Sequence, residues 1–156
     1  MKKCTILFLY IMAASRLSAQ QVPAIKWLQN YSDAVSISAK EKRPVLLFFH
    51  GSDWCPPCMQ MQKDVLSDTG FIFFSADKII FLDVDFPRKP PLTARQLKHN
   101  EALKKLFGLP DEFTQGYPQV VIIDAAGKVL YQEKGYAGEG PAKLTAVINN
   151  LKIQIQ

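Results

Sequence analysis

Residues 44–58 read Pro-Val-Leu-Leu-Phe-Phe-His-Gly-Ser-Asp-Trp-Cys-Pro-Pro-Cys, and they combine a strand, a turn and the start of a helix. The proline and the continuous apolar run after it predict a strand buried on both faces of a sheet. A polar break follows, in which Ser52 or Asp53 is expected to cap the next helix. Pro56 and Pro57 favour the start of that helix, since proline is tolerated in a first helical turn.

Two cysteines in this stretch, Cys55 and Cys58, have the C-x-x-C spacing. Cys55 lies at the expected helix start, where unpaired backbone amides and the helix dipole favour a thiolate. Cys58 lies one turn inside the helix, where it is sheltered and close enough to pair with Cys55. A thiolate beside a second thiol can exchange with a disulfide, so the motif predicts dithiol–disulfide redox chemistry.

Other interpretations of the cysteine pair remain open. A structural zinc site needs four protein ligands. His50 and His99 could complete a Cys₂His₂ set, although their spacing matches no zinc finger. A purely structural disulfide adds little stability when it closes so short a loop. A chaperone that binds a soft metal through both cysteines is a further alternative. The position between a buried strand and a helix favours redox catalysis.

Hydrophobic patterning predicts the remaining elements, and Pro87, Pro90 and Pro91 predict a loop among them. Helices are expected at 27–42, 56–66 and 94–107 and near the C-terminus, and strands at 78–84, 119–124 and 129–133. Alternating strands and helices imply parallel strands with crossovers, and the last two strands imply an added antiparallel hairpin. The predicted fold class is α/β, a three-layer α/β/α sandwich around a central mixed sheet.

The first residues have the pattern of a secretory signal peptide. Two lysines precede an apolar run at 6–14, and small residues follow up to Ala19. This run is too short for a membrane span, which needs roughly 20 apolar residues. We expect residues 1–19 to be a signal peptide. Residues 20–156 are expected to form one soluble domain in the periplasm or another exported location.

Composition and charge indicate an ordinary globular protein and give no argument for a nucleic-acid partner. The chain has 156 residues, of which 48% are hydrophobic and 21% charged, and this length fits one domain. The signal peptide contains Lys2, Lys3 and Arg16 but no acidic residue, so its removal lowers the net charge from +5 to +5 − 3 = +2. Cys4 would leave with it, and the mature chain would keep a single pair of cysteines.

Two motifs resemble the thioredoxin fold. Trp-Cys-Pro-Pro-Cys at 54–58 follows a hydrophobic strand, and Gly-Tyr-Pro at 116–118 precedes the apolar segment 119–124. The resemblance covers the chain from about Trp27 to Ile153. The signal peptide and the loop at 86–93 are similar to those of exported Dsb-type, DsbH-like members of the family.

This resemblance implies site residues. Cys55 and Cys58 would be the catalytic pair. Pro118 would follow a cis peptide bond and face the cysteines, and the backbone of Tyr117 would pair with a bound substrate strand. The other residues that it implies in the site are Trp54, Pro56 and Pro57. The resemblance implies no cofactor and no metal.

The sequence departs from the thioredoxin pattern at a buried aspartate, which acts as a proton acceptor in that family. The matching position falls on Phe48 or Phe49, and the candidates to replace the aspartate are His50 and Asp53. Other departures are Lys63 in place of a kinking proline and Tyr117 in place of the usual Ile or Val. These departures bear on the direction of electron flow more than on the chemistry.

We expect a monomeric reductase of protein disulfides. Cys55 would attack the substrate disulfide, and Cys58 would resolve the mixed disulfide. A disulfide oxidase or isomerase is the nearest alternative, although such Dsb proteins typically carry an inserted helical lobe or a dimerisation domain. The expected partners are disulfide-bonded protein substrates and, by the resemblance, a membrane electron donor of DsbD type.

Overall fold

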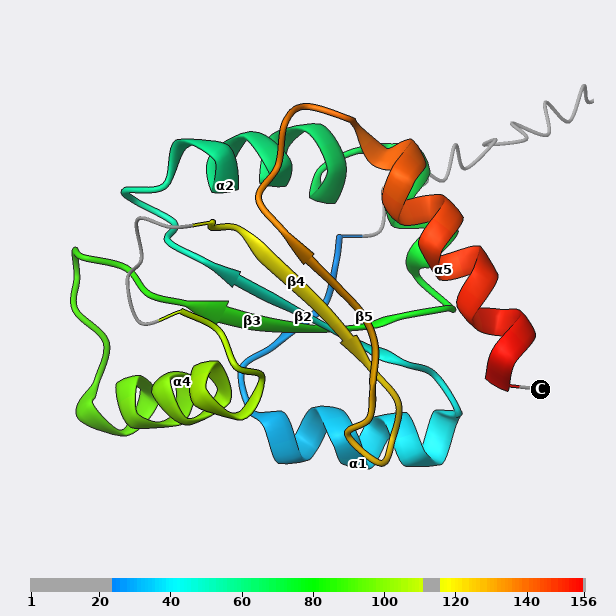
Figure 1. The fold of residues 1–156 in the computed structure, drawn as a ribbon, viewed down its shortest axis with the longest axis horizontal. Coiled ribbons are helices and arrows are strands. Elements are labelled where there is room, and N and C mark those ends of the chain that lie inside the picture. Colours follow the sequence, from blue (N-terminus) through cyan, green and yellow to red (C-terminus); the bar gives the residue numbers. More distant parts are fainter. Residues whose placement is uncertain (1–23, 111–115, 156) are drawn as a thin grey trace, which may run out of the picture.

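The computed structural model describes residues 24–110 and 116–155, with side chains up to Leu151 in the last helix. The expected signal peptide at 1–19, with Cys4, lies outside the described residues. A five-stranded sheet has the order β1-β3-β2-β4-β5 (Figure 1). Its strands are β1 (Trp27–Leu28), β2 (Val45–His50), β3 (Ile80–Asp85), β4 (Gln119–Ile123) and β5 (Val129–Lys134).

The sheet is mixed, as predicted. β1 and β2 both lie parallel to β3, β4 is antiparallel to β2, and β5 is antiparallel to β4. The direction of β4 differs from the prediction, because strand–helix alternation implies a parallel pair. Gln119 at the start of β4 lies opposite Phe49 near the end of β2. β4 therefore begins at the same end of the sheet as the C-terminal end of β2.

Helices cover both faces of the sheet (Figure 1). They are α1 (Tyr31–Glu41), α2 (Pro56–Met61), α3 (Thr69–Ser75), α4 (Ala94–Leu106) and α5 (Pro141–Ile155), and a π-helical turn, η1 (Gln62–Leu66), continues α2. α1 and α4 lie on one face, while α2 and α5 lie on the other, with α3 packed against α5. This is the predicted three-layer sandwich. Within the described residues, none of the helices is long and apolar enough to span a membrane.

The first element differs from the helix predicted at 27–42. Trp27 belongs to β1, and α1 begins at Tyr31 after the cap residue Asn30, whose side chain accepts backbone N–H groups of the first turn. The Trp27 ring packs against Phe81 of β3 with the ring centroids 5.3 Å apart. Apolar contact with the sheet therefore outweighs the helical pattern in this short segment.

α3 lies in a region where the sequence pattern predicts no helix. The carboxylate of Asp68 caps it by accepting the N–H of Phe71 at 2.7 Å. Phe71 and Ile72 are buried, while Phe73 is exposed. Seven residues are too few for a helical period to emerge, since periodicity is assessed over windows of about 11–18 residues.

β2 forms the centre of the core, and all six of its residues are buried. Successive side chains of a strand point to opposite faces of the sheet. Those of Val45, Leu47 and Phe49 pack in the cluster that includes α1 and α4 residues. Those of Leu46 and Phe48 pack in the cluster that includes α2 and α5 residues. The strand is covered on both faces, as its sequence predicts.

Leu47→Ala tests the central position of β2. Leu47 is 0% exposed, and its truncation leaves a cavity, so we expect the free energy of unfolding to fall by about 2–5 kcal/mol. Leu106→Ala is the matched control, because Leu106 is 62% exposed and should change the same free energy by less than about 0.5 kcal/mol. Guanidinium denaturation followed by circular dichroism measures both. Equal losses in the two variants would contradict this packing.

Candidate active site

Cys55 and Cys58 lie where β2 gives way to α2. They form a disulfide, with their Cα atoms 5.2 Å apart. Cys55 is the N-cap of α2, and its Sγ accepts the backbone N–H of Cys58 at 3.3 Å. Pro56 and Pro57 form the first turn of α2, as predicted. Cys55 is 3% exposed and Cys58 0%, so Cys55 is the more accessible of two well-covered residues.

The predicted cap residues, Ser52 and Asp53, have other partners. Ser52 donates its N–H and its hydroxyl to the Asp85 carboxylate at the end of β3, at 2.9 and 2.6 Å. The Asp53 carboxylate accepts the backbone N–H groups of Arg88 and Lys89 at 2.9 and 2.8 Å. The pKa of this exposed carboxyl is lower than its ordinary value, mainly because it accepts the Arg88 N–H. These bonds tie the turn before the cysteines to the segment after β3.

Trp54 reaches from the cysteines to that same segment. Its Nε1–H donates to the carbonyl oxygen of Phe86 at 2.7 Å. The guanidinium of Arg88 lies 5.0 Å from the centroid of the indole, and the ring of Tyr117 lies 6.2 Å away. A β-carbon on Gly51 would fall 2.1 Å from the indole. The indole is therefore held by several neighbours, and position 51 has room only for glycine.

Tyr117 and Pro118 reach the site from a distant part of the chain. The peptide bond between them is cis, as the resemblance implies. Tyr117 is 4% exposed and packs in the same apolar cluster as Cys55 and Cys58. β4 begins directly after Pro118 and pairs antiparallel with β2. This pairing brings the Tyr117–Pro118 segment to the end of β2 that the cysteines follow. That Pro118 faces Cys55 stays a prediction.

An apolar side chain takes the place of the buried aspartate of the thioredoxin pattern. Phe49 packs in the apolar cluster that contains both cysteines. The proposed substitute His50 points to the opposite face of β2, where it stacks on Phe48 with centroids 4.4 Å apart and its Nε2 lies 2.6 Å from Asp83 Oδ1. The other candidate, Asp53, is exposed, and its carboxylate accepts the backbone N–H groups of Arg88 and Lys89. Neither side chain takes the place of the aspartate.

The two histidines that could complete a zinc site have partners away from the cysteines. His50 pairs with Asp83, and His99 on α4 accepts the backbone N–H of Tyr31 at 3.2 Å. Among the side chains that the structure describes, no three histidine, cysteine or acidic residues are grouped so as to hold a metal ion.

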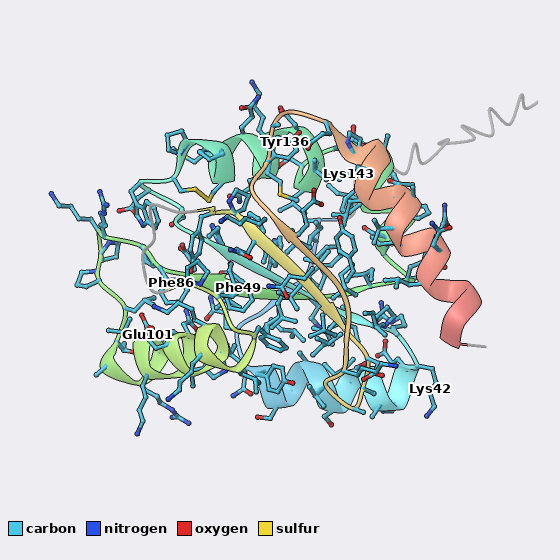
Figure 2. All side chains as sticks on the ribbon, in the orientation of Figure 1. Lys42, Phe49, Phe86, Glu101, Tyr136 and Lys143 are labelled. Carbon is cyan, nitrogen blue, oxygen red and sulfur yellow. A yellow bond between two sulfur atoms is a disulfide. The ribbon has the colours of Figure 1, made fainter. Side chains whose placement is uncertain are left out.

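The sequence pattern did not reveal the part of the site that comes from the segment after β3. Phe86 contributes through its carbonyl oxygen, and Arg88 and Lys89 contribute through their N–H groups. Side-chain type carries no signal for such contacts, and the prolines of the loop indicated only its position. Figure 2 shows Phe86 at the end of β3, on the side of the molecule where α4 lies.

Comparison with known proteins identifies the class of this protein. Residues 26–125 match the family described as Thioredoxin-like. The chain belongs to the thioredoxin-like family. This assignment agrees with the five-stranded mixed sheet and with the cysteine pair at the start of α2.

Particular relatives narrow the class. The disulfide bond reductase DsbH of Chlamydia pneumoniae is 33% identical over 130 residues, which cover 83% of this chain and 75% of that protein. A solved structure described as DsbH oxidoreductase matches with a TM-score of 0.73 at 33% identity, over 84% of this chain and 87% of the other. A thioredoxin from Thermus thermophilus shares the fold, with a TM-score of 0.61 at 20% identity over 85% of this chain and 90% of its own. The cysteine pair and the DsbH relatives make this chain a thiol–disulfide oxidoreductase.

Gly51→Ala tests the close approach of the backbone to Trp54. The added methyl group has no room, so the indole must move and its hydrogen bond to Phe86 is lost. We expect the free energy of unfolding to fall by at least the value of that bond, about 0.5–1.5 kcal/mol. Trp54 fluorescence, read in a Trp27→Phe background, should change at the same time.

Gly70→Ala is the control for this substitution. A β-carbon on Gly70, in α3, meets only the Asp68 side chain, at 3.2 Å, and does not contact the indole. The Trp54 emission spectrum of the Gly70→Ala variant, in the same Trp27→Phe background, should match that of the parent protein. An unchanged Trp54 spectrum in the Gly51→Ala variant would show that the indole does not depend on glycine at this position.

Proposed function

We propose that the protein reduces the disulfide bonds of exported proteins, with Cys55 as the attacking thiolate and Cys58 as the resolving thiol. The observation that carries this proposal is the position of Cys55 at the start of α2, with the Cys58 N–H 3.3 Å from its sulfur. A hydrogen bond to the sulfur and the dipole of the helix start both favour the thiolate over the thiol. In the reduced protein, Cys55 is then the nucleophile.

Reduction takes two exchange steps. The Cys55 thiolate attacks one sulfur of the substrate disulfide, forms a mixed disulfide and releases the other sulfur as a thiolate, which takes a proton from solvent. The Cys58 sulfur, after losing its proton to solvent, attacks Cys55 and releases the second substrate thiol. Two electrons pass to the substrate, and the protein ends in the disulfide form that the structure contains.

The neighbours of the cysteines are proposed to shape the substrate site. Trp54 is held by its bond to Phe86 and by the Tyr117 ring and the Arg88 guanidinium beside it, so it is proposed to offer a rigid surface to the substrate. The backbone of Tyr117 is proposed to pair with an extended substrate segment. Pro118 has no N–H and brings no competing donor to this place. Pro56 and Pro57 start the helix that carries the pair.

The direction toward reduction is supported by the relative described as a disulfide bond reductase, which is similar over most of both chains. A reductase must be re-reduced after each turnover, and the proposed donor of the two electrons is a membrane electron-transfer protein of DsbD type. We further propose that residues 1–19 are a signal peptide and that residues 20–156 act as a monomeric domain in the periplasm or another exported location.

Substitution of each cysteine separates their roles. Cys55→Ser should abolish the reduction of insulin with dithiothreitol as the electron source, because the attacking thiolate is lost. Cys58→Ser should keep one reactive thiolate but no resolving thiol, so mixed disulfides with the substrate should accumulate and be visible by mass spectrometry. Faster alkylation of Cys58 than of Cys55 in the reduced protein near neutral pH would reverse the assignment.

The equilibrium reduction potential of the Cys55–Cys58 couple, measured against glutathione, tests the direction. A reductase should have a potential near that of thioredoxin, about −270 mV, whereas a value near that of the strong oxidant DsbA, about −120 mV, would favour an oxidase. The two outcomes are well separated, since about 30 mV changes the equilibrium constant tenfold for a two-electron couple. Metal bound in stoichiometric amount to the purified reduced protein would favour the soft-metal chaperone instead.

A further inference from the structure

A groove of about 280 Å³ opens beside Trp54. It lies between the indole, the loop after β3 and α4, and Phe86, Leu92 and Leu97 give it an apolar lining. Leu97 of α4 is 45% exposed, so its side chain is accessible from the groove. Phe86, just after β3, and Glu101 of α4 both line the groove and are labelled in Figure 2. An apolar hollow lined by Trp54, the residue before Cys55 in the chain, can receive an apolar side chain of a partner.

Basic side chains lie near two segments of the site, beside Trp54 and beside Gly116. Arg88 is exposed and stacks over the indole of Trp54, and the exposed Lys89 follows it. On the side of the Tyr117 segment, Lys134 lies against Gly116, where a β-carbon would fall 1.9 Å from its Cε. A substrate segment that passes between Trp54 and the Tyr117 backbone therefore meets positive charge on each side.

The acidic side chains nearest to the groove already have partners. The Asp53 carboxylate accepts the N–H groups of Arg88 and Lys89. Glu101 forms an ion pair with the buried Lys104 at 2.7 Å. The Arg88 charge interacts with the Asp53 carboxylate, but Arg88 and Lys89 are both exposed, so a carboxylate brought by the substrate can approach them.

The loop that forms the groove is tied down before any substrate arrives. Asp53 holds its backbone at two N–H groups, and the Trp54 indole holds the Phe86 carbonyl. The side chain of Asn100 on α4 donates to the backbone oxygen of Asp85 at 2.7 Å, which links the helix to the end of β3. A preformed surface of this kind loses little conformational freedom on binding, which favours affinity.

We propose that this groove and its basic rim select the disulfides that the protein reduces. The preferred substrate segment carries an apolar residue and an acidic residue beside its reacting cysteine. The apolar side chain enters the groove between Trp54 and Leu97, and the carboxylate lies near Arg88, which makes Arg88 a specificity-determining residue. This inference rests on the proposed reductase function.

Four model peptides test the proposal. Each has one cysteine in a mixed disulfide with thionitrobenzoate, flanked by Leu or Ala on one side and by Asp or Lys on the other. The Cys55 thiolate of the pre-reduced protein attacks the peptide sulfur, and the coloured thionitrobenzoate leaves, so its release gives the second-order rate constant. The peptide with Leu and Asp should react fastest. Replacing Asp by Lys should slow it about two- to fivefold, the range of an exposed ion pair.

Three variants assign the preference to particular side chains. Arg88→Gln should bring the Asp-to-Lys rate ratio close to one, while Arg88→Lys, which keeps the charge, should retain much of it. Leu97→Ala should reduce the Leu-to-Ala ratio and leave the charge preference in place. Lys128→Gln is the matched charge control and should alter neither ratio. Lys128 lies in the turn between β4 and β5, at the end of the strands opposite the cysteines. Added salt should weaken the charge preference, since it screens exposed charges.

Each outcome bears on a different claim. Equal rates for all four peptides would overturn the selective groove and leave the reductase proposal intact. Absence of thionitrobenzoate release from every peptide would overturn the reductase proposal itself. An Asp preference that persists unchanged in Arg88→Gln would overturn the role of Arg88.

Discussion

Every residue of β2 is buried, and the place where this strand ends determines where the chemistry lies. β2 pairs with β3 on one side and with β4 on the other. This pairing brings three segments to the same end of the strands. They are the turn after β2, the segment after β3 and the segment before β4. The cysteines, the Phe86 carbonyl and the cis peptide bond before Pro118 come from these three segments.

Hydrogen bonds between these segments then determine the geometry around the sulfur atoms. Ser52 bonds to Asp85, Asp53 bonds to the backbone of the next loop, and the Trp54 indole bonds to the Phe86 carbonyl. The Asp53 pKa is lowered by its hydrogen bonds, so its contribution to stability is present at neutral pH. That contribution is lost as the pH falls from the ordinary aspartate range, about 3.9, through the lower folded-state pKa. The same bonds that hold the active-site turn also build the groove beside it.

The surroundings of Cys58, the proposed resolving cysteine, differ from the thioredoxin pattern. Phe49 lies in the cluster with Cys58 where that pattern has a carboxylate, and the hydrogen-bonded pair of His50 and Asp83 lies on the other face of β2. In the proposed mechanism the protons of the two exchange steps are therefore exchanged with solvent. In the proposed selection of substrates, recognition rests on the loop after β3 and on the groove that it forms with α4.

Local patterns in the sequence determined the α/β class, the buried strand, the helix start at Pro56 and the cysteine pair, because each depends on residues close together in the chain. Tertiary structure decided the β1 position of Trp27, the antiparallel direction of β4 and the partners of Asp53. It also decided that the Phe86 carbonyl would hold the Trp54 indole. These features depend on contacts between distant segments and on backbone groups that every residue carries, so residue type gives no signal for them.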